Sequence, residues 1–573
     1  MSAGERGAGW GGGSEARRQR GAEEADRGDA IRRLRASEEQ RVRKENRKTA
    51  QHVSGRFVGW GAIARGPSVR RRARLTAMIP PPWLPAAAGR DAAFSFVPNG
   101  HPLLMSTTNR REFLKQGMIG TAGVSIGAMG FSAKSYAAIK GANERINVAV
   151  IGIRNQGTVH LQSWSALKES HNVQVTTVCD VDERLFEPGV KLVEQKTGVK
   201  PATAVDMTEV FADRSIDAVS IVTPNHWHAL AAIRACQAGK HVYVEKPASH
   251  NIWEGRKMIE AARKYGVFMQ VGLNNRSARS VRDAMEFLHG GGIGEVYLAR
   301  ALCFKARDSY GLAKDGPPPA QFHYDRWLGP APLRPYNEKR SHYNWHWYWD
   351  TGNGDTGNTG PHHLDLARWG MGKNEHPVSV YSAGGIYGFR QEESTPENRT
   401  KGTRVYGGVE TYGHDKTAQE TPNTQTATYK YADGTMLEME TRGRYTNHEG
   451  SAGQEVSNLF YGSEGWLELG GNTWKAFKRR GRQPVAGSKD GERSGNHWAN
   501  FLEALRAGKP EQLHCDIHEG HLSTSLCHLA NISYRVGRSL KFMNEYEKFA
   551  GDPEADAFLS RVYRLPYVVP ATV

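Results

Sequence analysis

Hydrophobic residues occur in short runs separated by polar segments, and the pattern is clearest near the middle of the chain. Residues 218–222 form an apolar run that Pro224 ends, and residues 241–244 form a second run rich in β-branched side chains. Between them, apolar residues recur at near-helical spacing over residues 229–238, and Gly239 follows as a helix C-cap would. A strand, a helix and a strand within about thirty residues predict a βαβ unit with parallel strands.

The same alternation extends this unit on both sides. Apolar strands are predicted at residues 145–151 and 173–179, and a helix at 252–265 leads into a further strand at 267–272. Strands that alternate with helices indicate an open, doubly wound parallel sheet. We therefore predict a Rossmann domain over residues 139–276.

Beyond residue 276 the pattern changes from alternating strands and helices to paired strands. A helix at residues 281–289 precedes an apolar strand at 296–303. Two hairpins follow at residues 425–441 and 458–469, because in each a pair of strand-like runs is joined by a short glycine-containing turn. These pairs predict an open, mostly antiparallel sheet, so the fold class is α/β, with the Rossmann sheet followed by a C-terminal α/β domain. Also expected are helices at 496–506 and 519–536, a polar loop insertion at 387–419, a substrate-binding and oligomerisation domain spanning 277–545, and a peripheral tail at 546–573.

Charge is distributed unevenly along the chain. Residues 1–104 hold 20 basic and 10 acidic residues, whereas the part from Ile139 onward holds 52 and 49. The net charge of +16 therefore describes a basic leader, and it does not predict a nucleic-acid-binding face on the folded part. The composition of the leader predicts disorder, and we interpret it as the result of start-site choice, with a basic binding arm as the alternative. None of the five cysteines forms a CxxC pair, so no metal site is predicted, and one disulfide stays open.

Residues 105–138 have the pattern of a twin-arginine secretion signal. Arg110 and Arg111 begin the motif Arg-Arg-x-Phe-Leu-Lys, a weakly apolar run follows at 117–131, and small residues close the segment. The apolar run is shorter than the roughly twenty residues that a membrane span needs. The pattern predicts export to the periplasm by the twin-arginine translocation machinery.

The first predicted strand of the Rossmann domain ends in a loop typical of dinucleotide binding. Residues 152–157 read Gly-Ile-Arg-Asn-Gln-Gly, with Arg154 where a middle glycine is usual, and a pyrophosphate would lie at the N-terminus of the next helix. Asp180 ends the second strand, where an acidic side chain accepts a hydrogen bond from the ribose 2′-OH and disfavours a 2′-phosphate, so NAD is expected and NADP is less likely. The predicted cofactor-binding residues are Gly152, Arg154, Asn155, Gln156, Gly157, Asp180, Thr223, Pro224, Asn225, His228, Glu245, Lys246, Asn275 and Arg276.

Two segments hold candidate catalytic residues. Lys246 directly follows a strand of the βαβ unit, and a lysine at that edge of a parallel sheet can orient a hydroxyl or shuttle a proton. Pro361 predicts the first turn of a helix after a glycine-rich segment, which places His362 at a helix N-terminus. The helix dipole disfavours the imidazolium there, so His362 is available as a neutral base.

Aromatic residues with polar tips are concentrated between Tyr310 and Trp349. Flat rings stack on the C–H faces of sugars, although about half of such rings serve core packing instead. The predicted substrate-binding residues are Lys246, Tyr343, Trp347, His362 and His363.

These motifs together resemble the Gfo/Idh/MocA oxidoreductase family, in its subgroup with twin-arginine signals. The resemblance covers about residues 143–542. It implies NAD(P)-dependent oxidation or reduction of sugars and cyclitols, with a catalytic lysine at Lys246 and a catalytic histidine at His362. The motifs that support it are the 152–157 loop, Thr223-Pro224-Asn225, Glu245-Lys246-Pro247, Trp327-Leu328-Gly329-Pro330 and the glycine-rich segment ending at His362.

The chain departs from the family pattern at one catalytic position. The aspartate of the family's Asp-x-x-x-His pattern falls on Asn358, which cannot act as a base or as a carboxylate partner for Lys246. Asp355 or Asp365 is left as the source of the missing charge. Asn358 is kept as the third predicted catalytic residue.

The expected function is that of an NAD-dependent dehydrogenase acting on a CH–OH group of a sugar or cyclitol. His362 would take the hydroxyl proton while Lys246 orients that hydroxyl. Two alternatives stay open: a glycosidase or epimerase that oxidises its substrate transiently, and a non-catalytic sugar-binding protein on the same fold. The expected partner is a second copy of the chain, in a dimer or tetramer formed through the C-terminal sheet.

Overall fold

The computed structural model describes residues 144–307, 310–387, 418–444, 446–447, 453–471, 473–481, 483–488 and 495–573. The predicted leader, the predicted secretion signal and most of the predicted insertion at 387–419 lie outside these residues. None of the described helices combines the length and the apolar character that crossing a membrane requires.

The first sheet is parallel and has six strands in the order β3-β2-β1-β4-β5-β6. The strand order reverses between β1 and β4, so the loops that follow these two strands lead away from each other. Ligands bind in the crevice between such loops in sheets of this type. The predicted Rossmann sheet is confirmed. Its strands are β1 (Ile146–Ile151), β2 (Val173–Cys179), β3 (Ala202–Ala204), β4 (Ala218–Ile221), β5 (His241–Val244) and β6 (Met269–Val271).

One helix of this half begins earlier than its sequence pattern indicates. Helix α8 starts at Asn225, directly after Pro224, and not near residue 229. Most of its residues are buried, so it has little of the amphipathic contrast from which a helix boundary is predicted. The helices around the first sheet are α4 (Gln156–Ala166), α5 (Lys168–His171), α6 (Phe186–Thr197), α7 (Met207–Ala212), α8 (Asn225–Gln237) and α9 (Ile252–Tyr265).

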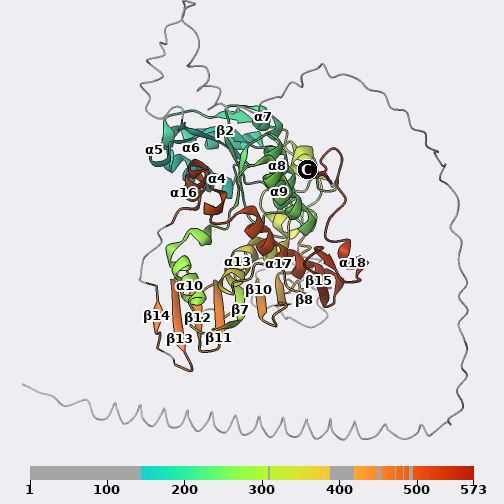
Figure 1. The fold of residues 1–573 in the computed structure, drawn as a ribbon. Helices are drawn as coiled ribbons and strands as arrows, with labels where there is room; N and C mark the ends of the chain where they lie inside the picture. Colours follow the sequence, from blue (N-terminus) through green and yellow to red (C-terminus); the bar gives the residue numbers. More distant parts are fainter. Residues whose placement is uncertain are drawn as a thin grey trace, which may run out of the picture. The chain divides into compact units, whose positions relative to one another are not determined.

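The second sheet has ten strands in the order β14-β13-β12-β11-β7-β10-β9-β8-β15-β16, and Figure 1 shows it at the opposite end of the described part from β2. Only β7 and β10 pair in parallel; the other neighbours are antiparallel, which confirms the predicted mostly antiparallel sheet and both hairpins. The strands are β7 (Val296–Cys303), β8 (Ser379–Gly385), β9 (Thr424–Lys430), β10 (Met436–Arg442), β11 (Val456–Gly462), β12 (Gly465–Gly470), β13 (Thr473–Lys478), β14 (Ala486–Gly487), β15 (Leu540–Met543) and β16 (Lys548–Phe549).

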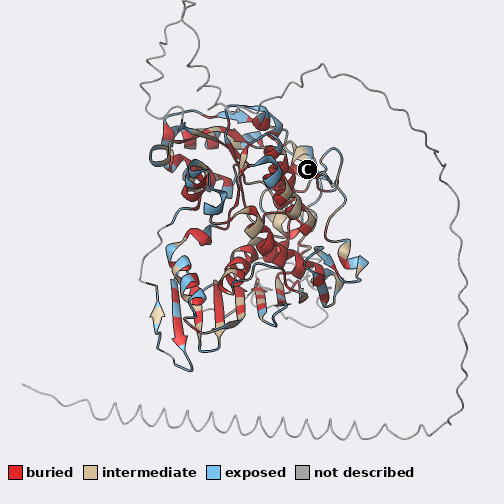
Figure 2. Cartoon of the chain, in the orientation of Figure 1, coloured by how far each residue is buried: buried red, intermediate tan, exposed pale blue. Residues whose placement is uncertain are grey.

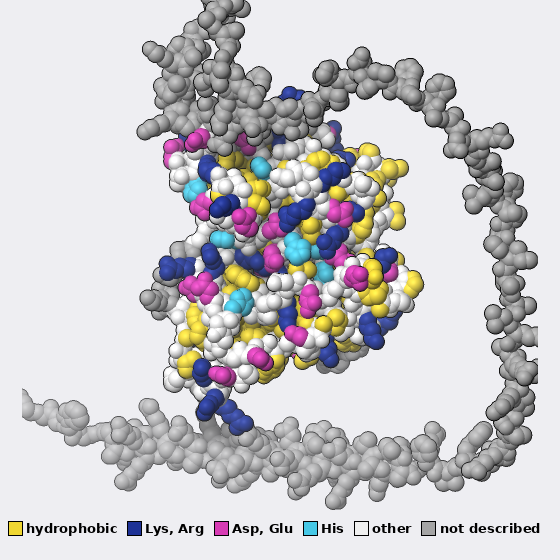
Figure 3. Space-filling model, viewed as in Figure 1, with side chains coloured by type: hydrophobic (Ala, Val, Ile, Leu, Met, Phe, Trp, Pro, Cys, Tyr) yellow, Lys and Arg dark blue, Asp and Glu magenta, His cyan; other side chains and the backbone are white. Residues whose placement is uncertain are grey.

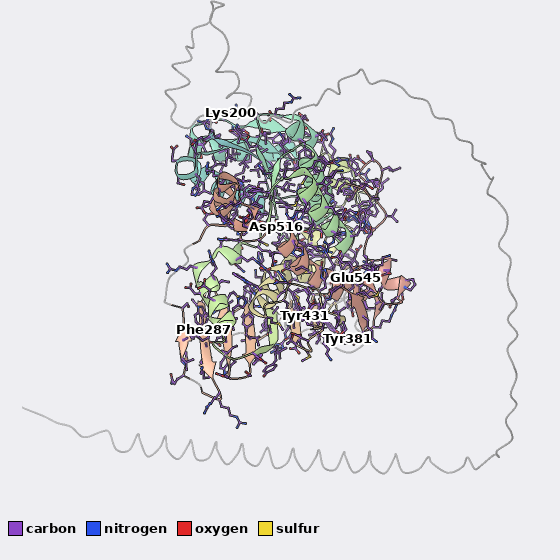
Figure 4. All side chains as sticks on the ribbon, viewed as in Figure 1. Lys200, Phe287, Tyr381, Tyr431, Asp516 and Glu545 are labelled. Carbon is purple, nitrogen blue, oxygen red and sulfur yellow. The ribbon has the colours of Figure 1, made fainter. Side chains whose placement is uncertain are left out.

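Helix α17 (Ile517–Val536) joins the cores of the two sheets, and Figure 2 shows it mostly buried. Ile517, in its first turn, packs in the core of the parallel sheet, whereas Leu526 packs in the core of the ten-stranded sheet. Asp516, labelled in Figure 4, caps this helix and forms an ion pair with Arg263 of α9. The other helices are α10 (Arg279–His289), α11 (Tyr324–Leu328), α12 (Gly354–Asn358), α13 (Gly360–Gly370), α16 (His497–Ala507), α17 (Ile517–Val536), α18 (Pro553–Asp556), η2 (Glu183–Leu185), η3 (Asn274–Ser277), η4 (Asn344–Trp347) and η5 (Pro510–Gln512).

The C-terminal tail is a structural part of the first half, so the expectation that it is peripheral is wrong. Val569 and Val573 are buried in the core of the parallel sheet. The Lys264 ammonium group of α9 donates a hydrogen bond to the carbonyl oxygen of Val573 at 2.5 Å, and the C-terminus lies beside α8 and α9 in Figure 1. Residues this far apart in sequence give no local signal of their contact.

Candidate functional site

A cleft of about 520 Å³ opens where the strand order of the parallel sheet reverses. Residues of the parallel-sheet half, the segment between the two halves and the tail all contribute to its walls. Most of the predicted cofactor-binding residues line it, namely Gly152, Arg154, Asn155, Gln156, Asp180, Thr223, Pro224, Asn225, His228, Glu245 and Lys246.

The loop between β1 and α4 is compact because two of its positions exclude a side chain. Gly152 has a φ of 85°, and a Cβ atom there would lie 2.7 Å from the carbonyl oxygen of Val222. A Cβ atom on Gly157 would lie 2.0 Å from the carbonyl oxygen of Gly152. The backbone therefore turns tightly into α4, and the helix N-terminus is open to an anionic pyrophosphate. Gly157 lies beneath this loop and does not line the cleft.

Asp180 links the end of β2 to the same loop. One of its carboxylate oxygens accepts a hydrogen bond from the backbone N–H of Ile153 at 2.9 Å, and the other accepts one from that of Asp182 at 3.0 Å. Burial raises the pKa of Asp180 to about 6, although both hydrogen bonds oppose that shift. Each oxygen keeps a lone pair for a ribose hydroxyl, so the residues at this end of the cleft fit a dinucleotide.

Glu245, the neighbour of Lys246 in sequence, is held by a buried hydrogen-bond chain. The indole N–H of Trp164 donates to the hydroxyl of Ser220 at 3.1 Å, and the two ring nitrogens of His160 lie 2.7 Å from that hydroxyl and 2.9 Å from a Glu245 oxygen. Burial alone would raise the pKa of Glu245, but the His160 hydrogen bond and nearby positive charge lower it to about 2. Glu245 is therefore ionised at neutral pH, and one of its carboxylate oxygens is held by the His160 ring.

The two strand-end segments that line the cleft are joined by His228. One ring nitrogen lies 2.7 Å from the carbonyl oxygen of Pro247 and the other 2.8 Å from that of Thr223. The side chain is buried, and this burial lowers its pKa. His228 therefore positions the loops around the cofactor cleft.

Lys246 meets Asn358, which lies 112 residues later in the chain. The Lys246 Nζ atom donates hydrogen bonds to the backbone carbonyl of Asn358 at 3.0 Å and to its side-chain oxygen at 3.3 Å. Burial lowers the pKa of Lys246, and the charges of Glu245 and Asp355 oppose this. Within the part of the chain that the structure describes, no carboxylate oxygen lies within 4.0 Å of this Nζ.

His362 lies at the beginning of α13, as predicted, and is half-buried. Its Nδ1 atom has no hydrogen-bond partner among the described residues. Burial, and then the positive charge of Lys246, hold its pKa well below the usual value, so the ring is neutral at neutral pH. A neutral imidazole close to a lysine can accept a proton from a hydroxyl that the lysine orients.

His363 does not belong to the site, which corrects the predicted substrate-binding role. Its Nδ1 atom lies 2.9 Å from the side-chain oxygen of Asn458, and its backbone carbonyl accepts a hydrogen bond from the same amide. The helix turns this residue about 100° away from His362 and toward β11. The reason is the helical period, which separates adjacent side chains.

Arg276 and Asn275 do not reach the cleft either, which corrects two predicted cofactor contacts. They follow β6, an edge strand of the parallel sheet. Arg276 is buried and donates to Asp365 at 2.8 Å and to Glu519 at 3.1 Å. The Asp365 carboxylate is therefore paired with Arg276, and it does not supply the negative charge that the family pattern places at position 358.

Of the two aromatic residues predicted to bind substrate, only Tyr343 lies among the residues that line the cleft. Tyr343 lines the cleft and is 42% exposed. Trp347 is buried beneath the guanidinium of Arg307 and does not line the cleft. The pattern of aromatic residues could not separate lining rings from packed ones. The lining residues that the sequence did not indicate individually include Asp206, Trp227, Arg234, Arg326, Trp327, His342, Trp345, His346, Pro566 and Tyr567.

One group among the described residues has the composition of a metal site, and it lies outside the cleft. Ligand atoms of His376, His521 and Glu547 lie within 4.8 Å of one another. The Arg256 guanidinium donates to both carboxylate oxygens of Glu547, and both histidines lie within hydrogen-bond distance of that carboxylate. The carboxylate charge is already paired with a cation, so this group serves as a link between α9 and the second half.

Comparison with known proteins agrees with this geometry. Residues 146–273 match the model described as "Oxidoreductase family, NAD-binding Rossmann fold", and residues 309–385 match that described as "Oxidoreductase family, C-terminal alpha/beta domain". The first match covers the strands, the glycine loop and Lys246. The cofactor of this fold is therefore NAD.

Three similar proteins illustrate the range of relatives. A myo-inositol 2-dehydrogenase of Thermotoga maritima is 31% identical over 156 residues, which is 27% of this chain and 44% of that protein. A glycosyl hydrolase family 109 protein of Shewanella pealeana is 26% identical over 172 residues, 27% of this chain and 37% of that protein. The chain thus spans less than half the length of these curated relatives. A levoglucosan dehydrogenase solved with NADH and levoglucosan shares the fold, with a TM-score of 0.50, 17% identity, and coverage of 69% of this chain and 99% of that one.

Proposed function

We propose that this chain is a member of the Gfo/Idh/MocA oxidoreductase family, whose models match residues 146–273 and 309–385, and that it is an NAD-dependent dehydrogenase acting on a CH–OH group of a sugar or cyclitol. The observation that best supports this is the meeting of Lys246 with Asn358 at the end of the NAD cleft, beside the start of α13. A lysine ammonium can stabilise the alkoxide that forms when a secondary alcohol is oxidised, and a neutral histidine can accept its proton.

Each residue has a distinct role in this proposal. When bound, NAD supplies the hydride acceptor. Lys246 Nζ donates a hydrogen bond to the substrate hydroxyl and stabilises the negative charge that develops on its oxygen. His362 accepts the hydroxyl proton, while Asn358 fixes the position of the Lys246 side chain.

The test is turnover by a lysine variant. We expect NAD reduction with at least one member of a panel of sugars and cyclitols, followed as absorbance of the reduced nicotinamide. Lys246→Met should lower kcat by at least about 100-fold, the low end for an acid–base group, and keep the Kd for NAD within about threefold. Lys200→Met, at the exposed lysine labelled in Figure 4, is the control. Near-normal turnover by Lys246→Met would reject the catalytic role.

A second candidate function is hydrolysis or epimerisation through transient oxidation of the substrate. It is favoured by the similarity to a glycosyl hydrolase family 109 protein. The same lysine and histidine would serve both reactions, because each begins with removal of a hydride and a proton. Product analysis separates them: a keto-sugar accumulates in the first case, and a hydrolysed or epimerised sugar in the second. A protein that binds sugars and never turns them over would be the non-catalytic alternative.

Export and retention of the cofactor belong to the proposal as well. The motif at Arg110 and Arg111 supports export by the twin-arginine machinery, which moves proteins that are already folded. An exported enzyme that lost NAD would have no pool to replace it, so NAD should stay bound between turnovers. Arg110→Lys with Arg111→Lys should keep the protein in the cytoplasm, and the exported protein should release near-stoichiometric nicotinamide in acid after dialysis. An exported protein that loses NAD on dialysis contradicts retention.

Assembly into a dimer or tetramer through the ten-stranded sheet also remains a proposal. The sheet is open, and Tyr381 of β8, labelled in Figure 4, is 51% exposed on it. Light scattering of the purified protein would show a single monomeric mass if this part of the proposal is wrong.

A further inference from the structure

The C-terminal tail is tied at several points to the helices beside the cofactor cleft. The guanidinium of Arg561 donates a hydrogen bond to the carbonyl oxygen of His226 in α8 at 2.7 Å. The Nε atom of Arg564 donates to the carbonyl oxygen of Gly329 at 2.9 Å, and its guanidinium pairs with the Asp325 carboxylate of α11 at 2.5 Å. Figure 3 shows hydrophobic side chains at the surface around the C-terminus that Figure 1 marks. The tail is therefore fixed in place against α8 and α11.

Two residues of this tail, Pro566 and Tyr567, line the cofactor cleft. The centroid of the Tyr567 ring lies 5.4 Å from that of the Trp227 indole, and the Arg564 guanidinium lies 4.9 Å from the same ring. Tyr567 is half-buried and also packs on the core of the parallel sheet. Because the ring is held by these contacts and still lines the cleft, part of its surface is available to a flat group of a ligand.

Neighbouring contacts place Tyr567 at the end of the cleft where Asp180 lies. The indole N–H of Trp227 donates to the carbonyl oxygen of Arg326 at 3.1 Å, and the Arg326 guanidinium forms an ion pair with Asp206 at 2.6 Å. Asp206 follows β3, and the backbone N–H of Asp180 donates to the last residue of β3 at 3.2 Å. All five of these residues line the cleft. Since Asp180 fits the ribose of the adenosine, Tyr567 lies on the side where the adenine would be held.

We propose that the C-terminal tail completes the cofactor site, with Tyr567 in contact with the adenine ring, and that this contact slows the release of NAD. The inference rests on the proposed function in one respect, the retention of NAD between turnovers. The tail lies outside residues 146–273 and 309–385, the two segments that the family models match. Aromatic side chains bind bases well, and a ring already held by protein contacts loses little freedom when the base arrives.

The dissociation rate of NADH measures this contact. Protein loaded with NADH is mixed with excess NAD, and release is followed as the change in NADH fluorescence. Tyr567→Ala should raise the dissociation rate about tenfold, because the aromatic contact with the base is lost. Tyr567→Phe keeps the ring and should recover the slow release.

A second probe, ADP-ribose, tests which part of the cofactor Tyr567 contacts. This molecule contains the adenine and lacks the nicotinamide. Its affinity, measured by displacement of NADH, should fall by about the same tenfold in Tyr567→Ala. A contact at the nicotinamide end would leave the affinity for ADP-ribose unchanged and would overturn the proposal.

Tyr563→Ala is the matched control. Tyr563 belongs to the same tail and packs on the same core, but its hydroxyl donates to Glu254 at 2.9 Å and it does not line the cleft. Its variant should release NADH within about twofold of the wild-type rate. Melting temperatures show whether each variant is folded.

Two further results would overturn the proposal even if sugars are oxidised and the proposed function stands. One is a dissociation rate for Tyr567→Ala that equals the wild-type rate. The other is an equal rise in Tyr563→Ala, which would assign the effect to the placement of the tail and not to the ring in the cleft. Conversely, release of NADH that depends on Tyr567 in a protein that oxidises no sugar would reject the proposed function alone.

Discussion

The two ends of the cleft are built in different ways. At the cofactor end, Gly152, Asn155 and Asp180 lie within one βαβ unit, and they are fixed by backbone conformation and by backbone hydrogen bonds. At the end that we propose to be catalytic, Lys246 and Asn358 come from opposite halves of the molecule and are 112 residues apart. The cofactor end is therefore specified locally, whereas the proposed catalytic end exists only when the two halves are packed together.

Asn353 is one of the residues that connect the two halves. Its side-chain oxygen accepts a hydrogen bond from the amide of Asn225 at 3.0 Å, and its own amide donates to the carbonyl of His250 at 3.1 Å. Its backbone carbonyl accepts from Asn531 of α17 at 2.9 Å. Because Asn353 directly precedes α12, these bonds set where Asn358 lies relative to Lys246.

The largest effect that separates the two ends is expected for Asn353→Ala. Removal of the amide deletes two of the hydrogen bonds that position α12 against the parallel-sheet half, and a displacement of about 1 Å at reacting groups can lower kcat by about 100-fold. The Kd for NAD should stay within about threefold, because Gly152, Asn155 and Asp180 are held by bonds within their own βαβ unit. Steady-state rates and an NAD titration measure both quantities.

A matched control for this variant is Asn337→Ala. Asn337 is also a buried asparagine whose amide donates to a backbone carbonyl, that of Ala313, but it lies outside the cleft. Both variants should lose similar thermal stability. An equal loss of NAD affinity in Asn353→Ala would show that the two ends are not independent, and the comparison would fail.

A smaller effect is expected for Asp180→Asn, and it should change NAD affinity and not kcat. An amide accepts a ribose hydroxyl less strongly than a carboxylate, so the Kd for NAD should rise about tenfold at neutral pH while kcat changes less than about threefold. The pKa of Asp180 is about 6. Since the ionised form binds the ribose, wild-type affinity should fall as the pH drops below 6, by about tenfold per unit.

The variant should lack this pH dependence, because the amide does not titrate in that range. Asp213→Asn, at an exposed aspartate, should keep the wild-type profile. Titrations of NAD between about pH 4.5 and 8 test both expectations. A pH-dependent affinity that persists in Asp180→Asn would assign the titration to another group.

Sequence reasoning succeeded where each element depends on its own residues. The β-branched runs at β1, β2 and β5 and the glycine turns of the β9–β10 and β11–β12 hairpins specify strands locally, and the structure confirms them. The helix at α13 was placed by Pro361 in its first turn. In contrast, the short strand β3 and helix α7 went unrecognised, because three and six residues hold too little periodicity to detect.

The sequence by itself determined the fold class, the glycine loop, Asp180, and the pairing of a Rossmann sheet with an antiparallel one, because these follow from spacing within short segments. Only the tertiary structure decided that Lys246 meets Asn358, that Arg276 and His363 leave the site, and that the tail joins the first core. Each of these depends on which distant surfaces pack together. A side chain's type and spacing fix the face it occupies on its own element, but the partner on that face comes from the whole chain.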